Sequence, residues 1–258
     1  MKNFDWLLKT PIAHRGLHGK NIEENSMSAF RAAADAGFPI ETDLHLLRDG
    51  ELAVFHDYDL KRITGHDIKI ENLSSGDLEK YPMKIGGEKI PLLKDLFSLA
   101  AGRVSPTGRV SPTGRVPLLL EIKSESLFDR RIEKALLKAL ESYPGKDRVA
   151  IQSFNQYSVR YIHNTAPQYP AGQLASRFED RRPRIKYAAF RNLRVLDISR
   201  PDFVSYDIGC MPDEILMKKR AKGMKVLAWT VDSEEKLALA QVYADNIIFE
   251  GIRLGDKS

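Results

Sequence analysis

The sequence contains a single cysteine, Cys210, and no long run of apolar residues. One cysteine excludes an intramolecular disulfide, and a lone thiol outside any motif is most often a small buried hydrophobic side chain. No stretch approaches the roughly 20 apolar residues of a membrane-spanning helix, so we predict no stable membrane insertion. The first nine residues carry charges where a secretory signal would need a longer apolar run, and a cytoplasmic location is therefore expected.

Neither sign of charge dominates the sequence. Lys and Arg number 40 against 35 Asp and Glu, which gives a net charge of +5 and favours anionic partners such as nucleic acid, phospholipid headgroups or small phosphate esters. No basic stripe interleaved with aromatic residues and no zinc-finger spacing is present, so we predict no nucleic-acid partner. The composition, 43% hydrophobic and 29% charged over 258 residues, indicates a globular protein with a substantial core.

Short apolar runs alternate with longer helical patterns, an order typical of parallel βα units. The length fits a single TIM (β/α)8 barrel over residues 1–258, because such barrels commonly take about 250 residues. Nine strands are predicted for eight places, so either Leu52–His56 or the weak segment Gly172–Ala175 is expected outside the closed sheet. The predicted strands are Ile12–His14, Ile40–Leu47, Leu52–His56, Leu118–Lys123, Val149–Phe154, Gly172–Ala175, Phe203–Tyr206, Val226–Val231 and Ile247–Phe249.

Helices with recognisable ends separate these strands. The first follows a cap at Asn25 or Ser26 and stops at Gly37. Three further helices are predicted. One has Pro212 near its first turn and ends at Gly223, and another begins after a cap at Asp232 or Ser233. The third covers Asp129–Tyr143.

Two segments do not follow the barrel pattern. Residues 57–91 have poor periodicity and frequent glycine, which predicts a small insertion over the strand ends, between an early strand and the next helix, and a candidate lid. Residues 102–116 contain the hexapeptide Gly-Arg-Val-Ser-Pro-Thr twice in tandem and then begin it again. We expect an exposed loop lengthened by local duplication. The alternative is a basic binding arm formed by Arg103, Arg109 and Arg115.

Acidic residues alternate along the second predicted strand. Glu41, Asp43 and His45 share one face, with successive members about 7 Å apart, and in a barrel this face points inward. Buried carboxylates are costly unless they bind a cation or a cationic partner, so Glu41 and Asp43 suggest a hard divalent metal ion.

Glu121 and Lys123 repeat the pattern on a later strand, where they could add a third carboxylate ligand and an ammonium group for a phosphate oxygen. Taken alone, such a pair also fits an internal salt bridge that fills a barrel layer. Three further residues near predicted strand ends favour a functional site, because barrel enzymes build their active sites there. They are His14, Arg15 and His56.

A set of short motifs occurs in a fixed order between residues 13 and 231. They are Ala13-His14-Arg15-Gly16, Glu24-Asn25-Ser26 with Ala29-Phe30, Glu41-Thr42-Asp43, Asp49-Gly50, His56-Asp57 with Leu60, Arg62 and Thr64, Pro91-Leu92, Glu121-Ile122-Lys123, Ser153-Phe154 and Trp229-Thr230-Val231. In this order they resemble the glycerophosphodiester phosphodiesterase family, which is related in fold to the phosphatidylinositol-specific phospholipases C.

The resemblance implies a TIM barrel that holds one divalent metal ion, Mg²⁺ or Ca²⁺, and uses two histidines as general acid and base. Two cationic side chains would bind the phosphate, and an aromatic residue would pack on the glycerol or alcohol moiety unless it only fills the core. The corresponding residues are Glu41, Asp43 and Glu121 for the metal, His14 and His56 for proton transfer, Arg15 and Lys123 for the phosphate, and Trp229 for the alcohol.

Two positions depart from the family pattern. In the segment after Asp43, Arg48 stands where a Thr is usual. The same segment contains His45, which is either an extra polar group near the metal or a core histidine with its hydrogen bonds satisfied; we favour the second interpretation. Glu250 and Gly251 follow the last strand, where relatives tend to have Thr-Asp and then Pro. Closure of the last strand and its support of the site are therefore open.

The implied activity is hydrolysis of a glycerophosphodiester, such as a deacylated phospholipid, to glycerol 3-phosphate and an alcohol. The partner is then a small-molecule diester, and a homo-oligomer stays open. One alternative is a lysophospholipase D-like enzyme or related phospholipid diesterase that acts at a membrane surface. The other is a catalytically silent barrel that binds a phosphate ligand, which the two departures leave open.

Overall fold

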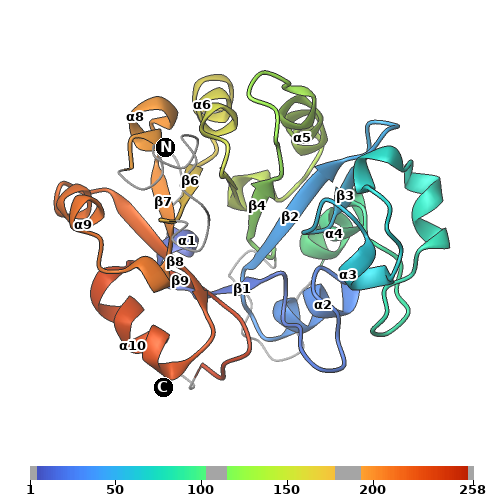
Figure 1. The fold of residues 1–258 in the computed structure, drawn as a ribbon, viewed down its shortest axis with the longest axis horizontal. Helices are drawn as coiled ribbons and strands as arrows, with labels where there is room; N and C mark the ends of the chain where they lie inside the picture. The colour runs from blue at the N-terminus through green and yellow to red at the C-terminus, as the bar shows by residue number, and fades with distance from the viewer. Residues whose placement is uncertain (1–4, 103–114, 178–192, 255–258) are drawn as a thin grey trace.

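In the part of the chain that the structure describes, eight parallel strands close into a barrel surrounded by helices (Figure 1). The computed structural model describes residues 5–102, 115–177 and 193–254. Strand β1 pairs with both β2 and β9, which closes the sheet and confirms the predicted TIM barrel. The barrel strands are β1 (Ile12–His14), β2 (Ile40–Leu46), β4 (Leu118–Ile122), β5 (Val149–Ser153), β6 (Ala171–Ala175), β7 (Phe203–Asp207), β8 (Lys225–Val231) and β9 (Asn246–Phe249).

The ninth strand, β3 (Leu52–Val54), lies outside the barrel and runs antiparallel to β2. Of the two segments considered for that position, the one that begins at Leu52 is therefore the correct one. The weak segment around Gly172 is a true barrel strand, β6, between β5 and β7.

The barrel interior is apolar at its amino end and polar above. Helix α1 closes the amino end with Trp6 and Leu7, which belong to the same buried cluster as the inward-facing residues of the strands. The strand members of this cluster are Ile12, Leu119, Ala150, Phe203, Leu227 and Ile248. The opposite faces of the strands pack against the outer helices in a second, larger core. The next inward residue along β1 and β4 is polar, so the functional groups gather at the carboxyl end.

The outer helices begin and end close to the predicted capping and terminating residues. Ser26 caps α2 by accepting a hydrogen bond from the backbone N–H of Ala29, and Ser233 caps α10 in the same way through Lys236. Outside residues 57–91, the described helices are α1 (Asp5–Lys9), α2 (Met27–Asp35), α4 (Leu93–Ala101), α5 (Arg131–Glu141), α6 (Gln156–Thr165), α8 (Val195–Ser199), α9 (Glu214–Ala221) and α10 (Glu234–Tyr243), with short 3-10 helices η3 (Lys146–Arg148) and η4 (Ile208–Cys210). Cys210 is a free, half-buried thiol.

Residues 57–91 lie to one side of the barrel beyond β3 (Figure 1). They contain α3 (Lys61–Thr64) and two 3-10 helices, η1 (Ile70–Asn72) and η2 (Ser75–Lys80). Such short elements explain the poor helical periodicity. Their apolar side chains form a separate cluster with the end of β2 and with β3, which consists of Leu47, Ala53, Phe55, Leu60, Ile63, Ile70, Leu73, Leu78, Met83 and Ile90.

The predicted 102–116 loop lies, from residue 103 to residue 114, outside the described residues, and with it Arg103 and Arg109. Across the described ranges, no helix combines the length and the hydropathy that crossing a membrane requires.

Candidate active site

Three carboxylates meet inside the barrel on β2 and β4. Asp43 of β2 is in register with Glu121 of β4, and Glu41 lies two residues earlier on β2. Each residue is at most 6% exposed, and one oxygen of each lies within 4.8 Å of the others. Burial, together with repulsion by Asp43 and Glu121, raises the pKa of Glu41 well above its ordinary value.

Two cationic side chains lie against this cluster. Lys123 Nζ is 2.9 Å from Asp43 Oδ1 and 2.6 Å from Glu121 Oε1. Arg15 Nε is 3.3 Å from Asp43 Oδ2, and the Arg15 backbone N–H donates to Glu41. Burial opposes ionisation of Asp43, but Lys123 and Arg15 hold its pKa far below its ordinary value.

Internal salt bridges therefore do form, as the simpler interpretation of the acid–base pairs expected. Within this group of five, however, three carboxylates face two cations. Salt bridges alone therefore do not give each carboxylate of the cluster a cationic partner of its own.

The donor set fits a hard divalent cation. Carboxylate oxygens are ligands that Mg²⁺ and Ca²⁺ prefer. Burial and like-charge repulsion raise the pKa of Glu41, and a bound cation would offset both causes. Glu41, Asp43 and Glu121 could therefore hold a metal ion together.

His14, at the end of β1, lies between this cluster and the last strand. Its Nε2 is 4.0 Å from Glu41 Oε2, and its Nδ1 is 2.5 Å from Oε2 of Glu250, which follows β9. The Nε2 atom of His18 lies 3.4 Å from the same Glu250 oxygen. A carboxylate only accepts hydrogen bonds, so Nδ1 of His14 carries a proton and Nε2 is turned toward Glu41.

Glu250 stays ionised in this position. Its hydrogen bond with His14 and the nearby ring of His18 hold its pKa well below the ordinary value. Burial lowers the pKa of His14 in spite of Glu250. The last strand thus closes the barrel and also supplies a carboxylate partner for His14, which the sequence left open.

His56 follows β3 and has a carboxylate partner of its own. Its Nδ1 is 2.6 Å from Asp57 Oδ1. The backbone N–H of Phe55, the residue before His56, donates to the Asp43 carbonyl at 3.0 Å, so His56 follows directly on a backbone contact with the strand that carries Glu41 and Asp43. The structure thus brings His14 and His56 to the same group of charges.

Several polar residues that hold the cluster were not predicted as site residues. Asn25 was considered as a helix cap and as part of a family motif, without a role in the site, but its Nδ2 donates to Asp43 Oδ2 at 2.9 Å while its Oδ1 accepts from Thr42. Gln152 of β5 donates to Glu41, and Ser205 of β7 donates to Gln152 at 2.7 Å. The sequence signal for Gln152 is its polar side chain two residues after Ala150, on the inward face of β5.

Trp229 lies on β8, half-buried against the interior core. Its Nε1 donates to the Ser205 carbonyl at 2.9 Å, and its ring meets Phe154 edge to face at 5.6 Å. His45 is 4% exposed, donates from Nε2 to the His56 carbonyl and packs on Tyr58. Burial lowers the pKa of His45 to about 4. The interpretation of His45 as a satisfied core histidine is confirmed.

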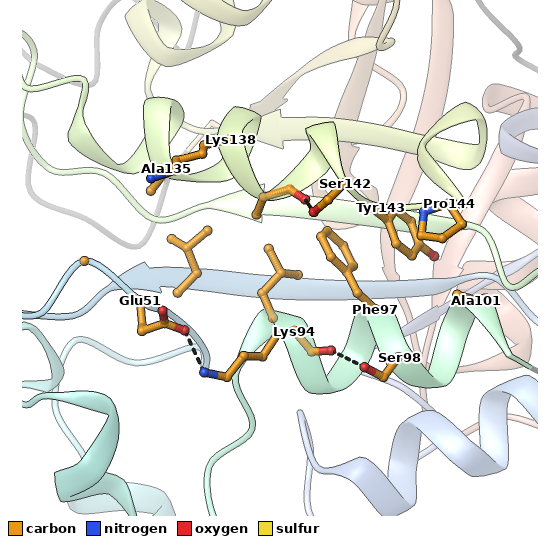
Figure 2. Close-up of a pocket in the computed structure, with 14 residues that line it drawn as sticks. Glu51, Lys94, Phe97, Ser98, Ala101, Ala135, Lys138, Ser142, Tyr143 and Pro144 are labelled. Carbon is orange, nitrogen blue, oxygen red and sulfur yellow. Dashed lines mark hydrogen bonds and ion pairs between the residues drawn. The ribbon is translucent and has the colours of Figure 1, made fainter.

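A separate cavity of about 840 Å³ lies outside the barrel between α4 and α5 (Figure 2). Phe97 stacks on Tyr143 along its wall, and Lys94 pairs with Glu51 at its edge. None of the predicted site residues lines this cavity. The charged cluster inside the barrel is therefore the candidate active site.

Carboxylates that can hold a cation, cationic side chains that can hold a phosphate and histidines that can move protons converge at the mouth of a parallel barrel. This combination defines the class of TIM-barrel phosphodiesterases. The chain belongs to the glycerophosphoryl diester phosphodiesterase family, whose model matches residues 14–252.

Individual relatives agree with this assignment. A glycerophosphodiester phosphodiesterase of Caldanaerobacter subterraneus is 31% identical over 88% of this chain and 87% of its own length. The human lysophospholipase D GDPD1 is 36% identical over 35% of this chain and 32% of its own. An Oleispira antarctica phosphodiesterase, solved with the product sn-glycerol-3-phosphate, has the same fold, with a TM-score of 0.75 and 23% identity over 95% of this chain and 93% of its own.

Proposed function

We propose that this protein hydrolyses glycerophosphodiesters to glycerol 3-phosphate and an alcohol in a metal-dependent reaction. The observation that carries the proposal is the buried cluster of Glu41, Asp43 and Glu121, which faces Arg15 and Lys123 in a barrel of this family. The Oleispira antarctica structure with bound sn-glycerol-3-phosphate supports a product of this kind. A cytoplasmic location and self-association stay predictions.

Arg15 and Lys123 would bind the phosphate. A phosphodiester carries one negative charge that increases in the transition state, and cations already held in place stabilise that increase without reorganisation. Glu41, Asp43 and Glu121 would hold Mg²⁺ or Ca²⁺, which would supply Lewis-acid stabilisation of the same charge.

His14 and His56 would move the protons. Glu250 and Asp57 bind the Nδ1 atoms of the two rings, which leaves each Nε2 for exchange with the substrate. One imidazole accepts a proton from the nucleophile, and the other protonates the leaving alcohol. Trp229, held by its bond to the Ser205 carbonyl, would pack on the glycerol or alcohol moiety.

The experiment measures alcohol release from soluble headgroup diesters with calcium, magnesium or manganese. We expect release by the wild type, loss on chelation, and a fall in kcat/KM of about 100-fold or more in Glu41→Gln, because one carboxylate of the cluster is lost. Glu51→Gln, a change at an exposed carboxylate, should keep full activity. Activity that survives both chelation and Glu41→Gln would refute the metal assignment, while phosphate binding without turnover would favour the silent barrel.

A second candidate, lysophospholipase D-like activity, is favoured by exposed apolar side chains on two segments that follow site residues. Leu127 and Phe128, on the loop that follows β4, are 47% and 84% exposed, and Tyr58, two residues after His56, is 44% exposed. Exposed apolar side chains on segments that leave a diester site suit an acyl chain. The partial match to human lysophospholipase D GDPD1 supports the same substrate class.

Replacement of both Leu127 and Phe128 by Ser separates the two candidates. If acyl chains bind there, turnover of a long-chain lysophospholipid should fall about tenfold or more, since removing two buried apolar contacts costs at least about 1.5 kcal/mol. Turnover of a soluble headgroup diester should stay unchanged. Val242→Ser, at a 62% exposed residue of α10, is the control. An equal effect on both substrates would count against the lysolipid candidate.

A further inference from the structure

Arg62, on α3 of the 57–91 segment, binds two carboxylates at the edge of the candidate site. Its Nε and Nη2 donate to the two oxygens of Asp57 at 2.7 and 3.0 Å. Its Nη1 and Nη2 donate to the two oxygens of Glu24 at 2.8 and 2.7 Å. Asp57 in turn binds Nδ1 of His56, and Glu24 accepts from Nη1 of Arg15 at 2.7 Å. One guanidinium therefore joins the partners of a proposed proton-transfer residue and a proposed phosphate ligand.

The charges and the geometry of this group are complementary. The side chains of Glu24 and Asp57 are 13% and 21% exposed, and that of Arg62 is 48% exposed. Hydrogen bonds from Arg62 and Arg15 lower the pKa of Glu24 although burial opposes this, so the carboxylate is ionised. Arginine suits this position because its planar fork offers five N–H donors and can bind two carboxylates bidentately, whereas lysine offers a single point charge.

We propose that Arg62 is a positioning residue for the diesterase reaction. It holds Asp57 against His56 and Glu24 against Arg15, so one side chain of the 57–91 segment orients both the proton-transfer group and the phosphate-binding group. This inference rests on the proposed function. It assigns the segment a role in the reaction beyond its packing against β2 and β3.

A half-exposed ion pair without such a role would contribute little, because solvent and salt screen the attraction between exposed charges. The test variant is Arg62→Lys, which keeps the positive charge but cannot bridge both carboxylates. We expect kcat/KM to fall about 10- to 100-fold, the usual effect of losing a residue that orients a direct ligand, with Tm close to that of the wild type. Arg48→Ala, which removes a 67% exposed side chain with a single bond to Asp77, should keep full activity.

Double-mutant cycles distinguish positioning from a general effect on structure. Asp57→Asn should lower mainly kcat, through His56, and Glu24→Gln should raise mainly KM, through Arg15. In a background that already carries Asp57→Asn or Glu24→Gln, Arg62→Lys should change the kinetic constants less than it does in the wild type, because the interaction through which Arg62 acts is already lost. Fully multiplicative losses in both cycles would overturn the proposal. The proposal would also be overturned if Arg48→Ala lowered kcat/KM as much as Arg62→Lys does. It would be overturned as well if the Tm of Arg62→Lys fell below the assay temperature and so accounted for the lost activity.

A readout without turnover separates this inference from the proposed function. The ¹⁵N NMR shifts of the His56 ring report its tautomer at a pH where the imidazole is neutral. Asp57 should hold the proton on Nδ1 in the wild type, and Arg62→Lys should give a mixture of tautomers, because Asp57 is then free to turn. An unchanged tautomer would overturn the role of Arg62. Absence of alcohol release by the wild type would refute only the proposed function.

Discussion

His14, His45 and His56 lie close to the carboxylate cluster, and their partners give them different properties. His14 and His56 bind carboxylates through Nδ1. His45 binds the backbone carbonyl of His56 and is 4% exposed. A carboxylate compensates a protonated ring, whereas a carbonyl in a buried site compensates it only in part. Burial therefore makes His45 a neutral residue of the core.

Protonation of His45 should destabilise the folded protein in acid. Its pKa is about 4 in the folded chain against an ordinary value of 6.5, so between these pH values the unfolded chain binds the proton and the folded chain does not. The free energy of unfolding therefore falls as the pH falls, by on the order of 3 kcal/mol for this residue.

Urea unfolding of the wild type and of His45→Gln across this range isolates that effect. The variant keeps an amide donor for the His56 carbonyl but has no proton to gain, so the wild type should lose stability relative to it as the pH falls. Parallel stability curves for the two proteins would show that His45 does not control the acid response.

At the level of elements, β6 shows why one barrel strand gave a weak signal. A Cβ atom on Gly172 would lie 2.2 Å from ring carbons of Phe203 on the neighbouring strand β7. Phe203 belongs to the apolar cluster inside the amino end of the barrel. Glycine is needed here because of this close approach, although it lowers strand propensity.

Gly172→Ala should destabilise the barrel by about 1–3 kcal/mol, the usual cost of overpacking a core. Gly76→Ala is the matched control, since a Cβ atom there meets nothing within 4 Å. Chemical denaturation measures both. Phe203→Leu should partly restore stability in the Gly172→Ala background, and an equal effect of Gly172→Ala in both backgrounds would contradict the assigned contact.

Across the whole molecule, the chain carries a net charge of +5, yet its barrel interior brings together Glu41, Asp43 and Glu121. The distribution of charge, and not its sum, determines which ligand each part of the molecule favours. The surrounding barrel keeps the three carboxylates together, so they can bind a cation in the folded chain only.

Divalent cations should therefore raise the stability of the whole protein. A ligand that binds only the folded state at 100 times its Kd adds about 2.7 kcal/mol, which corresponds to a Tm increase of several degrees for a chain of this size. Thermal unfolding with EDTA and then with magnesium, calcium or manganese measures this shift. Glu121→Gln should reduce it and Glu51→Gln should not. If none of the three cations raises the Tm of the wild type, the cluster does not bind metal under these conditions.

Much of the architecture was predictable because it depends on local patterns. The alternation of apolar strands and helices predicted the barrel, and the two-residue period of β2 placed Glu41 and Asp43 on its inward face. The two helix caps were predictable to within one residue, as Asn25 or Ser26 and as Asp232 or Ser233, because a cap acts within three residues of itself; the structure selects Ser26 and Ser233.

What the sequence by itself determined, then, was the set of strands, their inward faces and the chemical groups that reach the carboxyl end of the barrel. Only the tertiary structure decided how these groups are paired. Glu250 meets His14 across 236 residues of sequence, Gln152 meets Glu41 across 111, and Arg62 meets Glu24 across 38. Strand parity fixes the direction of a side chain, but barrel closure and the packing of residues 57–91 bring such distant partners within hydrogen-bond distance.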